Sequence, residues 1–121
     1  MSVLLWAGVV VIGGLGSVLR FLVDRTAARR AATGFPLGTL TVNVTGSLLL
    51  GLANGLTTIP DVLLLAGVAA IGSYTTFSTW MLETQRLGEE RQTGLAVANL
   101  LISVILGVAA AALGRTIGVH L

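Results

Sequence analysis

The sequence predicts an all-α membrane protein with four transmembrane helices, and two observations support this class. Of the 121 residues, 55% are hydrophobic and only 10% are charged, whereas a soluble domain carries about 25% charged residues. Four apolar segments, at 3–23, 37–57, 62–82 and 95–116, each approach the ~20 residues that a helix needs to cross the hydrocarbon core. Because the intervening segments are too short to fold alone, residues 1–121 are expected to form a single four-span domain.

Charge and cysteine content narrow the class further. The formal net charge is +2, and every basic side chain other than the one histidine is an arginine. Arginines in loops that face the cytoplasm and the lipid headgroups explain this charge better than nucleic-acid binding does. The absence of cysteine excludes a disulfide framework and a thiolate metal site. The first segment lacks a basic leader and a convincing cleavage site, so it is expected to be a retained helix and not a signal peptide.

The third apolar segment contains small and polar residues at a depth where a membrane helix is normally apolar. The run reads Gly72-Ser73-Tyr74-Thr75-Thr76-Phe77-Ser78-Thr79-Trp80. Ser and Thr hydroxyls compete with helical backbone bonding, and glycine has low helix propensity, so the third helix is expected to break near its middle. Broken backbone at bilayer depth is tolerated only where protein buries it or where it lines a watery cavity. This run therefore predicts a permeation or ion-binding site.

Two other spans carry polar stripes at helical spacing. The stripes are Thr39, Asn43 and Ser47 on the second span, and Asn99 and Ser103 on the fourth, where Gly107 continues the stripe. Hydrogen bonding that simply holds helices together is the plainer interpretation for any one of these side chains. With three spans carrying such residues, a polar pathway is at least as good an interpretation.

The residue types favour a small, strongly hydrated anion as the permeating species. Hydroxyls and the amide NH₂ of Asn43 can donate hydrogen bonds to an anion that loses its water. Arg20 adds a positive charge near the end of the first span, although an arginine there can also simply reach the headgroups. Phe77 and Trp80 lie three residues apart, and the electropositive edges of their rings attract an anion. Packing against lipid is the alternative for both rings.

Ionisable residues limit the mechanism. No Asp, Glu, Lys or His lies in the middle of the four apolar segments, whereas proton-coupled transporters usually place a carboxylate or histidine there. The sequence has no phosphate-binding loop and no catalytic set of side chains, so an enzyme is not expected and passive conduction fits best. A small multidrug exporter has a similar size, but it needs a carboxylate in the first span, and residues 1–19 contain none.

Three motifs resemble the CrcB (Fluc) family of fluoride channels from microbial membranes over nearly the whole chain. They are Gly13-Gly14-Leu15-Gly16-Ser17-Val18-Leu19-Arg20, Gly38-Thr39-Leu40-Thr41-Val42-Asn43-Val44-Thr45-Gly46-Ser47, and Thr75-Thr76-Phe77-Ser78-Thr79 with Glu83 following. The resemblance implies an antiparallel, dual-topology dimer with two narrow pores in the cytoplasmic membrane. It also implies that fluoride leaves the cell passively through these pores, which lowers its toxicity.

The resemblance further implies roles for individual residues. Backbone carbonyls of Gly72 and Thr75 would bind a structural Na⁺ at the dimer centre, which is not transported. Phe77 and Trp80 would form an aromatic box, with Asn43 as its amide donor. The remaining pathway positions are Asn99 and Ser103 on a polar track, Thr39 near it, and Arg20 and Glu83 at the vestibule.

The sequence departs from the family pattern in ways that leave two assemblies open. Trp80 replaces the usual second Phe, Asn99 stands where Tyr is common, and Gly107 stands where a hydroxyl is frequent. Six of the seven arginines fall on one predicted side of the membrane, and only Arg115 falls on the other. A chain that inserts in both orientations should show little such bias. The partner is therefore either a second copy or an oppositely oriented homologue, in which case this chain is a non-conducting or half-conducting subunit.

Overall fold

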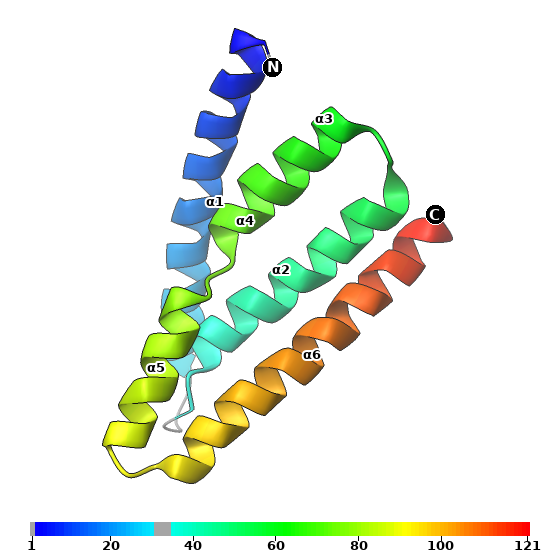
Figure 1. The fold of residues 1–121 in the computed structure, drawn as a ribbon. Helices are drawn as coiled ribbons and strands as arrows, with labels where there is room; N and C mark the ends of the chain where they lie inside the picture. Colours follow the sequence, from blue (N-terminus) through cyan, green and yellow to red (C-terminus); the bar gives the residue numbers. More distant parts are fainter. Residues whose placement is uncertain (1, 31–34) are drawn as a thin grey trace.

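The computed structural model describes residues 2–30 and 35–121, and all of its regular elements are helical (Figure 1). The elements are α1 (Val3–Arg30), α2 (Leu37–Leu56), α3 (Pro60–Leu63), the π-helical segment η1 (Leu64–Ile71), α4 (Gly72–Tyr74), α5 (Ser78–Glu89) and α6 (Thr93–Val119). Within this part of the chain, four helical stretches are long and apolar enough to span a membrane: Val3–Thr26, Leu37–Leu56, Pro60–Glu89 and Thr93–Val119. The predicted all-α class with four candidate spans is confirmed.

Three of the helical stretches are longer than the apolar segments that predicted them. The first continues past residue 23 to Arg30, and the third continues past residue 82 to Glu89. The predicted segments end where the side chains become polar. The backbone hydrogen bonds of a helix can continue past that point into the headgroup region and beyond it. The charged residues at these ends are therefore carried on helical extensions and not on loops.

Helices α2 and α6 lie side by side and run in the same direction (Figure 1). Glycines make this close approach possible: Gly51 and Gly55 on α2, and Gly114 and Gly118 on α6. A Cβ atom placed on Gly114 would overlap the carbonyl of Leu48, and one placed on Gly51 would overlap the carbonyl of Ala111. Small residues thus bring the two backbones into direct contact, as is common between membrane helices.

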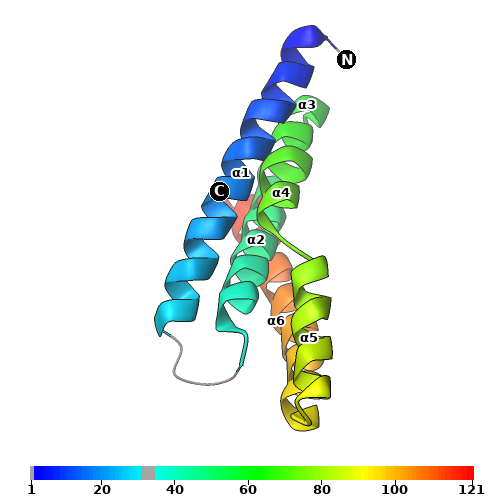
Figure 2. The ribbon, with the colours of Figure 1, turned by 90° about the vertical axis from the view of Figure 1, so that its left-hand side faces the viewer.

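The third span is broken in the middle, as predicted. Helix α4 ends at Tyr74, the next residue Thr75 is extended with a ψ of 164°, and α5 begins at Ser78. The half before the break packs chiefly against α1, while the half after it packs against α6 (Figures 1 and 2). On α1, Gly16 permits the first contact, because a Cβ atom there would clash with the Ala70 carbonyl. The break therefore lets the two halves of one span reach different neighbours.

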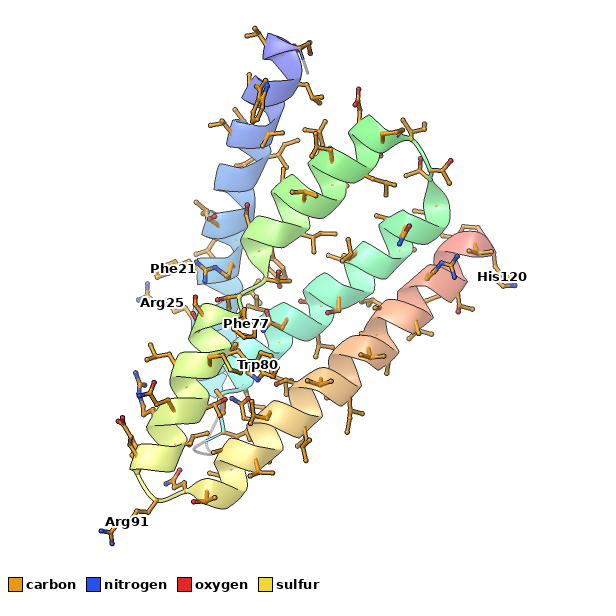
Figure 3. The ribbon with its side chains drawn as sticks, in the orientation of Figure 1. Phe21, Arg25, Phe77, Trp80, Arg91 and His120 are labelled. Carbon is orange, nitrogen blue, oxygen red and sulfur yellow. The ribbon has the colours of Figure 1, made fainter. Side chains whose placement is uncertain are left out.

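Both chain ends and the connection between α2 and α3 lie toward one end of the molecule, and the turn between α5 and α6 lies at the other (Figure 1). Arg25 and Arg91 lie in the half remote from His120 (Figure 3). This agrees with the side predicted for these arginines. The side chains of Arg29 and Arg30, which the same prediction includes, fall outside the described residues.

Candidate functional site

Asn43 closes the gap in the third span with its side chain. Its Oδ1 accepts a hydrogen bond from the Thr76 backbone N–H at 2.8 Å, and its Nδ2 donates to the Thr76 carbonyl at 2.8 Å. The two bonds together fix which amide atom is O and which is N, since only one orientation matches a donor and an acceptor. Nδ2 carries a second N–H that Thr76 does not use. Asn43 is thus both a structural clamp and a remaining donor at the break.

The break leaves the carbonyls of residues 72–75 without their helical donors, and those of Gly72 and Thr75 are the two that the sequence predicts as ion ligands. In a continuous helix, the N–H of Thr76 would donate to Gly72 and that of Thr79 to Thr75. Instead, the Thr76 N–H is held by Asn43, and the Thr79 N–H donates to the Thr76 hydroxyl at 3.2 Å. Gly72 is exposed and Thr75 is half-buried. These carbonyls fit the oxygen chemistry that a hard cation such as Na⁺ requires, and glycine adds no side chain to block approach.

The aromatic pair lies at the start of α5, next to the break (Figure 3). The rings of Phe77 and Trp80 meet edge to face, with centroids 5.7 Å apart and planes at 82°. Phe77 is 69% exposed in the single chain, although it lies at mid-span, while Trp80 is half-buried. The indole Nε1 donates to the backbone carbonyl of Asn99 at 3.1 Å. The polar end of Trp80 is therefore engaged by α6.

Two open pockets share a wall made by Asn43, Ser47 and Trp80. The first, of about 310 Å³, also includes Phe77 and the carbonyl-bearing residues Gly72 and Thr75. The second, of about 410 Å³, extends along α6. Its lining from α6 is Ser103, Val104, Gly107, Val108 and Ala111. Neither lining contains an ionisable side chain, so both pockets offer hydroxyls, an amide and aromatic rings to whatever enters them.

Three predicted residues lie beyond these pockets. Thr39, which is 3% exposed, donates its hydroxyl to the carboxylate of Glu83 and so joins α2 to α5. Arg20 is half-buried on α1, and its Nε is buried without a hydrogen-bond partner among the described residues. Arg20 shares a helix face with Gly16, which packs on the third span, and with Asp24, which packs on Gly38. It thus lies between the break and the start of α2.

Asn99 is placed differently from its neighbour on the stripe. It is 1% exposed, and its Nδ2 donates to the Thr84 hydroxyl at 2.8 Å across the α5–α6 contact. Ser103, one turn later, donates to Asn99 Oδ1 at 3.4 Å and also lines the second pocket. The geometry therefore gathers Asn43, Gly72, Thr75, Phe77, Trp80 and Ser103 around the pockets, and it leaves Asn99 between helices.

Two residues with a place in this arrangement were absent from the predicted set. Ser47 lines both pockets, and its position on the Thr39–Asn43 stripe is the signal that identifies it. Thr84 bonds both Trp80 and Asn99, but nothing in its sequence context separates it from the other threonines near helix ends.

Comparison with known proteins identifies the family of the chain. The family model described as CrcB-like protein, Camphor Resistance (CrcB), matches residues 7–115. A protein of Mycobacterium tuberculosis named fluoride-specific ion channel FluC 2 is 62% identical over 117 residues, which cover 97% of this chain and 93% of the relative. FluC 2 of Mycolicibacterium paratuberculosis is 60% identical, over 94% of this chain and 93% of its own length. FluC 1 of Leifsonia xyli is 39% identical, over 98% and 89%. With a family model spanning most of its length and relatives this similar, the chain belongs to the CrcB family.

Proposed function

We propose that this protein is a passive, fluoride-specific channel subunit of a microbial cytoplasmic membrane, through which fluoride leaves the cell. It is a multi-pass membrane protein and not an enzyme. The proposal draws on the names of its relatives and on one structural observation. That observation is the wall of Asn43, Ser47 and Trp80 that two mid-span pockets share.

The wall suits a small anion for chemical reasons. One N–H of the Asn43 amide remains after the clamp on Thr76, and it can donate to an anion beside the ring of Phe77. Ring edges carry partial positive charge and attract anions, whereas a carboxylate in the same place would repel them. The pocket linings contain no carboxylate. Fluoride is small enough to exchange its water for such closely spaced donors.

A second, oppositely oriented subunit would complete the site. Phe77 is 69% exposed and Gly72 is exposed, both beside pockets that open to the outside of the single chain. Free carbonyls at mid-membrane need a protein surface or water against them. In an antiparallel dimer, the carbonyls of Gly72 and Thr75 would hold a structural Na⁺ at the centre. The ion would supply a fixed positive charge beside the anion pathway.

A heterodimer is the second candidate assembly, and the arginines favour it. Arg20 and Arg25 lie in the second half of α1, and Arg86 and Arg91 lie near the end of α5 and just after it. Arg115 lies near the C-terminal end of α6. Such a bias directs insertion in one orientation. A chain inserted in one orientation needs an oppositely inserted homologue to form an antiparallel pair. In that assembly the unusual residues Trp80 and Gly107 would reduce or abolish conduction through one pore.

The test is fluoride efflux from liposomes that contain only this purified protein, followed with a fluoride electrode. Rapid, proton-independent fluoride loss with chloride retained supports the channel. Drug-dependent proton flux would instead indicate an exporter. Efflux that appears only when an oppositely oriented homologue is co-reconstituted supports the heterodimer, and no efflux under either condition overturns the proposed function.

A further inference from the structure

Helix α5 is joined to α6 by a closed ring of hydrogen bonds with Thr84 at its centre. The Thr84 hydroxyl donates to the Trp80 carbonyl at 2.8 Å and accepts from Asn99 Nδ2 at 2.8 Å. The ring closes where the Trp80 indole N–H donates to the Asn99 backbone carbonyl at 3.1 Å. Asn99 is 1% exposed, so the ring lies away from lipid and water.

Each bond in the ring constrains the next. A hydroxyl has one proton, and because Thr84 donates it to Trp80, its lone pairs face the amide of Asn99. The other end of that amide, Oδ1, accepts from Ser103, which holds the side chain in one orientation. Asn99 is thereby fixed on α6 with its backbone carbonyl beneath the indole. Removing one member leaves the others with unsatisfied groups in a buried place.

The ring determines how the indole meets the pockets. Trp80 is anchored through its indole N–H by α6, and the same residue belongs to the wall that both pockets share. The indole of Trp80 also meets the phenyl ring of Phe77 edge to face, with 5.7 Å between the ring centroids. A small rotation of the indole about its anchor would change both the width of the pockets and this aromatic contact.

Thr45 resembles Thr84, because its hydroxyl bonds both its own helix and Tyr74 of α4, whereas Thr41 and Thr116 differ from Thr84 and serve as comparisons. Thr41 and Thr116 also donate to carbonyls four residues earlier in their own helices, a common arrangement in membrane helices. Neither hydroxyl bonds a second helix in the described structure. Thr84 does, and its partner lies beneath the indole.

We infer that Thr84 is a positioning residue: through Asn99, its hydroxyl sets the orientation of the Trp80 indole at the pocket wall and thereby the rate of fluoride passage. The part that concerns rate rests on the proposed function. The part that concerns the indole is independent of it, and the two are tested separately.

The first experiment measures fluoride efflux from liposomes. Thr84→Val keeps the shape of the side chain but leaves Asn99 Nδ2 with only its long contact of 3.5 Å to the Trp80 carbonyl. The substitution is expected to slow efflux roughly tenfold. Thr84→Ser restores the hydroxyl and should restore the rate. Thr116→Val removes a hydroxyl that bonds only its own helix, so it should leave the rate unchanged. An undiminished rate in Thr84→Val, or a loss that Thr84→Ser does not restore, would overturn the inference.

The second experiment measures the mobility of the Trp80 indole directly. The chain has two tryptophans, and Trp6 is exposed on α1, so Trp6→Phe leaves Trp80 as the sole tryptophan, which can be excited selectively over Tyr74. Time-resolved fluorescence anisotropy should show a larger fast decay for Thr84→Val than for Thr84→Ser or Thr116→Val. If Thr84→Val slows efflux while the indole stays as rigid as before, Thr84 is not a positioning residue. If the unmodified protein passes no fluoride either alone or with an oppositely oriented homologue, the proposed function fails, and the anisotropy alone decides the role of Thr84.

Discussion

At the scale of single residues, Asn43 shows how a membrane helix can break without leaving backbone groups unsatisfied at the clamped residue. Its amide has a donor and an acceptor in the spacing of a peptide group, and it bonds both the N–H and the C=O of Thr76. Unsatisfied peptide groups in hydrocarbon cost several kcal/mol each, so a side chain with only a donor or only an acceptor would not serve. The same amide then has one N–H left for the pocket.

Asn43→Asp should therefore impair conduction in two ways. A carboxylate cannot donate to the Thr76 carbonyl, and it places a negative charge in the path of an anion. Fluoride efflux is expected to fall at least ~100-fold, because a hydrogen bond to a charged group contributes up to about 3 kcal/mol, and a loss of that size corresponds to this factor. Asn54→Asp is the matched control, because Asn54 is exposed near the end of the same helix. Equal efflux from both variants would contradict the role of Asn43.

Phe77→Ile tests the aromatic edge. The substitution keeps apolar bulk and removes the ring, so efflux should be abolished or greatly slowed while the protein still assembles. Phe21→Ile makes the same change on the exposed face of α1 and should conduct normally. Size-exclusion chromatography checks assembly, and a fluoride electrode measures the rate. Unchanged efflux from Phe77→Ile would show that the anion does not pass the ring.

The sequence was informative about which residues lie at mid-span and less so about what they face. Helical spacing placed Asn99 and Ser103 on one stripe, but residues on the same stripe can still contact different neighbours. Asn99 lies against α5 at 1% exposure, whereas Ser103 reaches the second pocket. Which neighbour a stripe faces depends on how the helices cross, and this is set by contacts far apart in the chain. Thr84 was missed for the same reason.

At the scale of elements, glycines hold the molecule together by letting carbonyls and helix backbones touch. Gly114→Ala would push a methyl group into the Leu48 carbonyl, and backbone cannot move aside as a flexible side chain can. We expect a loss of roughly 1–3 kcal/mol of stability, the usual cost of overpacking. Gly14→Ala is the control, because a Cβ atom there meets nothing within 4 Å. Thermal unfolding in detergent should separate the two variants, and equal midpoints would contradict the packing argument.

The break in the third span was predictable, but the route of its two halves was not. The Ser and Thr run between residues 72 and 80 marks the break, and Thr75 is indeed extended there. The π-helical segment at Leu64–Ile71 has no comparable signal in the sequence, because its residues are ordinary apolar helix residues. Its position beside α1, where Gly16 meets Ala70, indicates that tertiary contact and not local propensity sets this geometry.

At the scale of the whole molecule, the proposed dimer with its structural sodium can be tested through the effect of sodium on stability. If carbonyls of Gly72 and Thr75 from two subunits bind Na⁺, the ion stabilises the dimer by mass action, by about 2.7 kcal/mol at 100 times its Kd. The dimer should then unfold at a higher temperature in sodium chloride than in choline chloride at equal ionic strength. Identical unfolding in the two salts would count against a structural sodium site.

The arrangement of arginines decides between the two assemblies. Arg86 and Arg91 lie near the end of α5 and in the turn that follows it, and Arg20 and Arg25 lie in the second half of α1. This distribution predicts that both termini face outward when the chain is expressed alone. The chain contains no cysteine, so single cysteines report orientation without background. Leu121→Cys should react almost completely with an impermeant maleimide added to intact cells, and Glu89→Cys, at the opposite end, should be protected.

A dual-topology homodimer predicts a different pattern, because half of the copies then present each end outward. About half of Leu121→Cys and half of Glu89→Cys would react before the cells are opened, and all of both would react afterwards. That outcome, together with efflux from liposomes containing this chain alone, would exclude the need for a second gene product. One-sided labelling would instead mean that the proposed antiparallel pair needs an oppositely inserted homologue, because identical copies inserted in one orientation cannot form it.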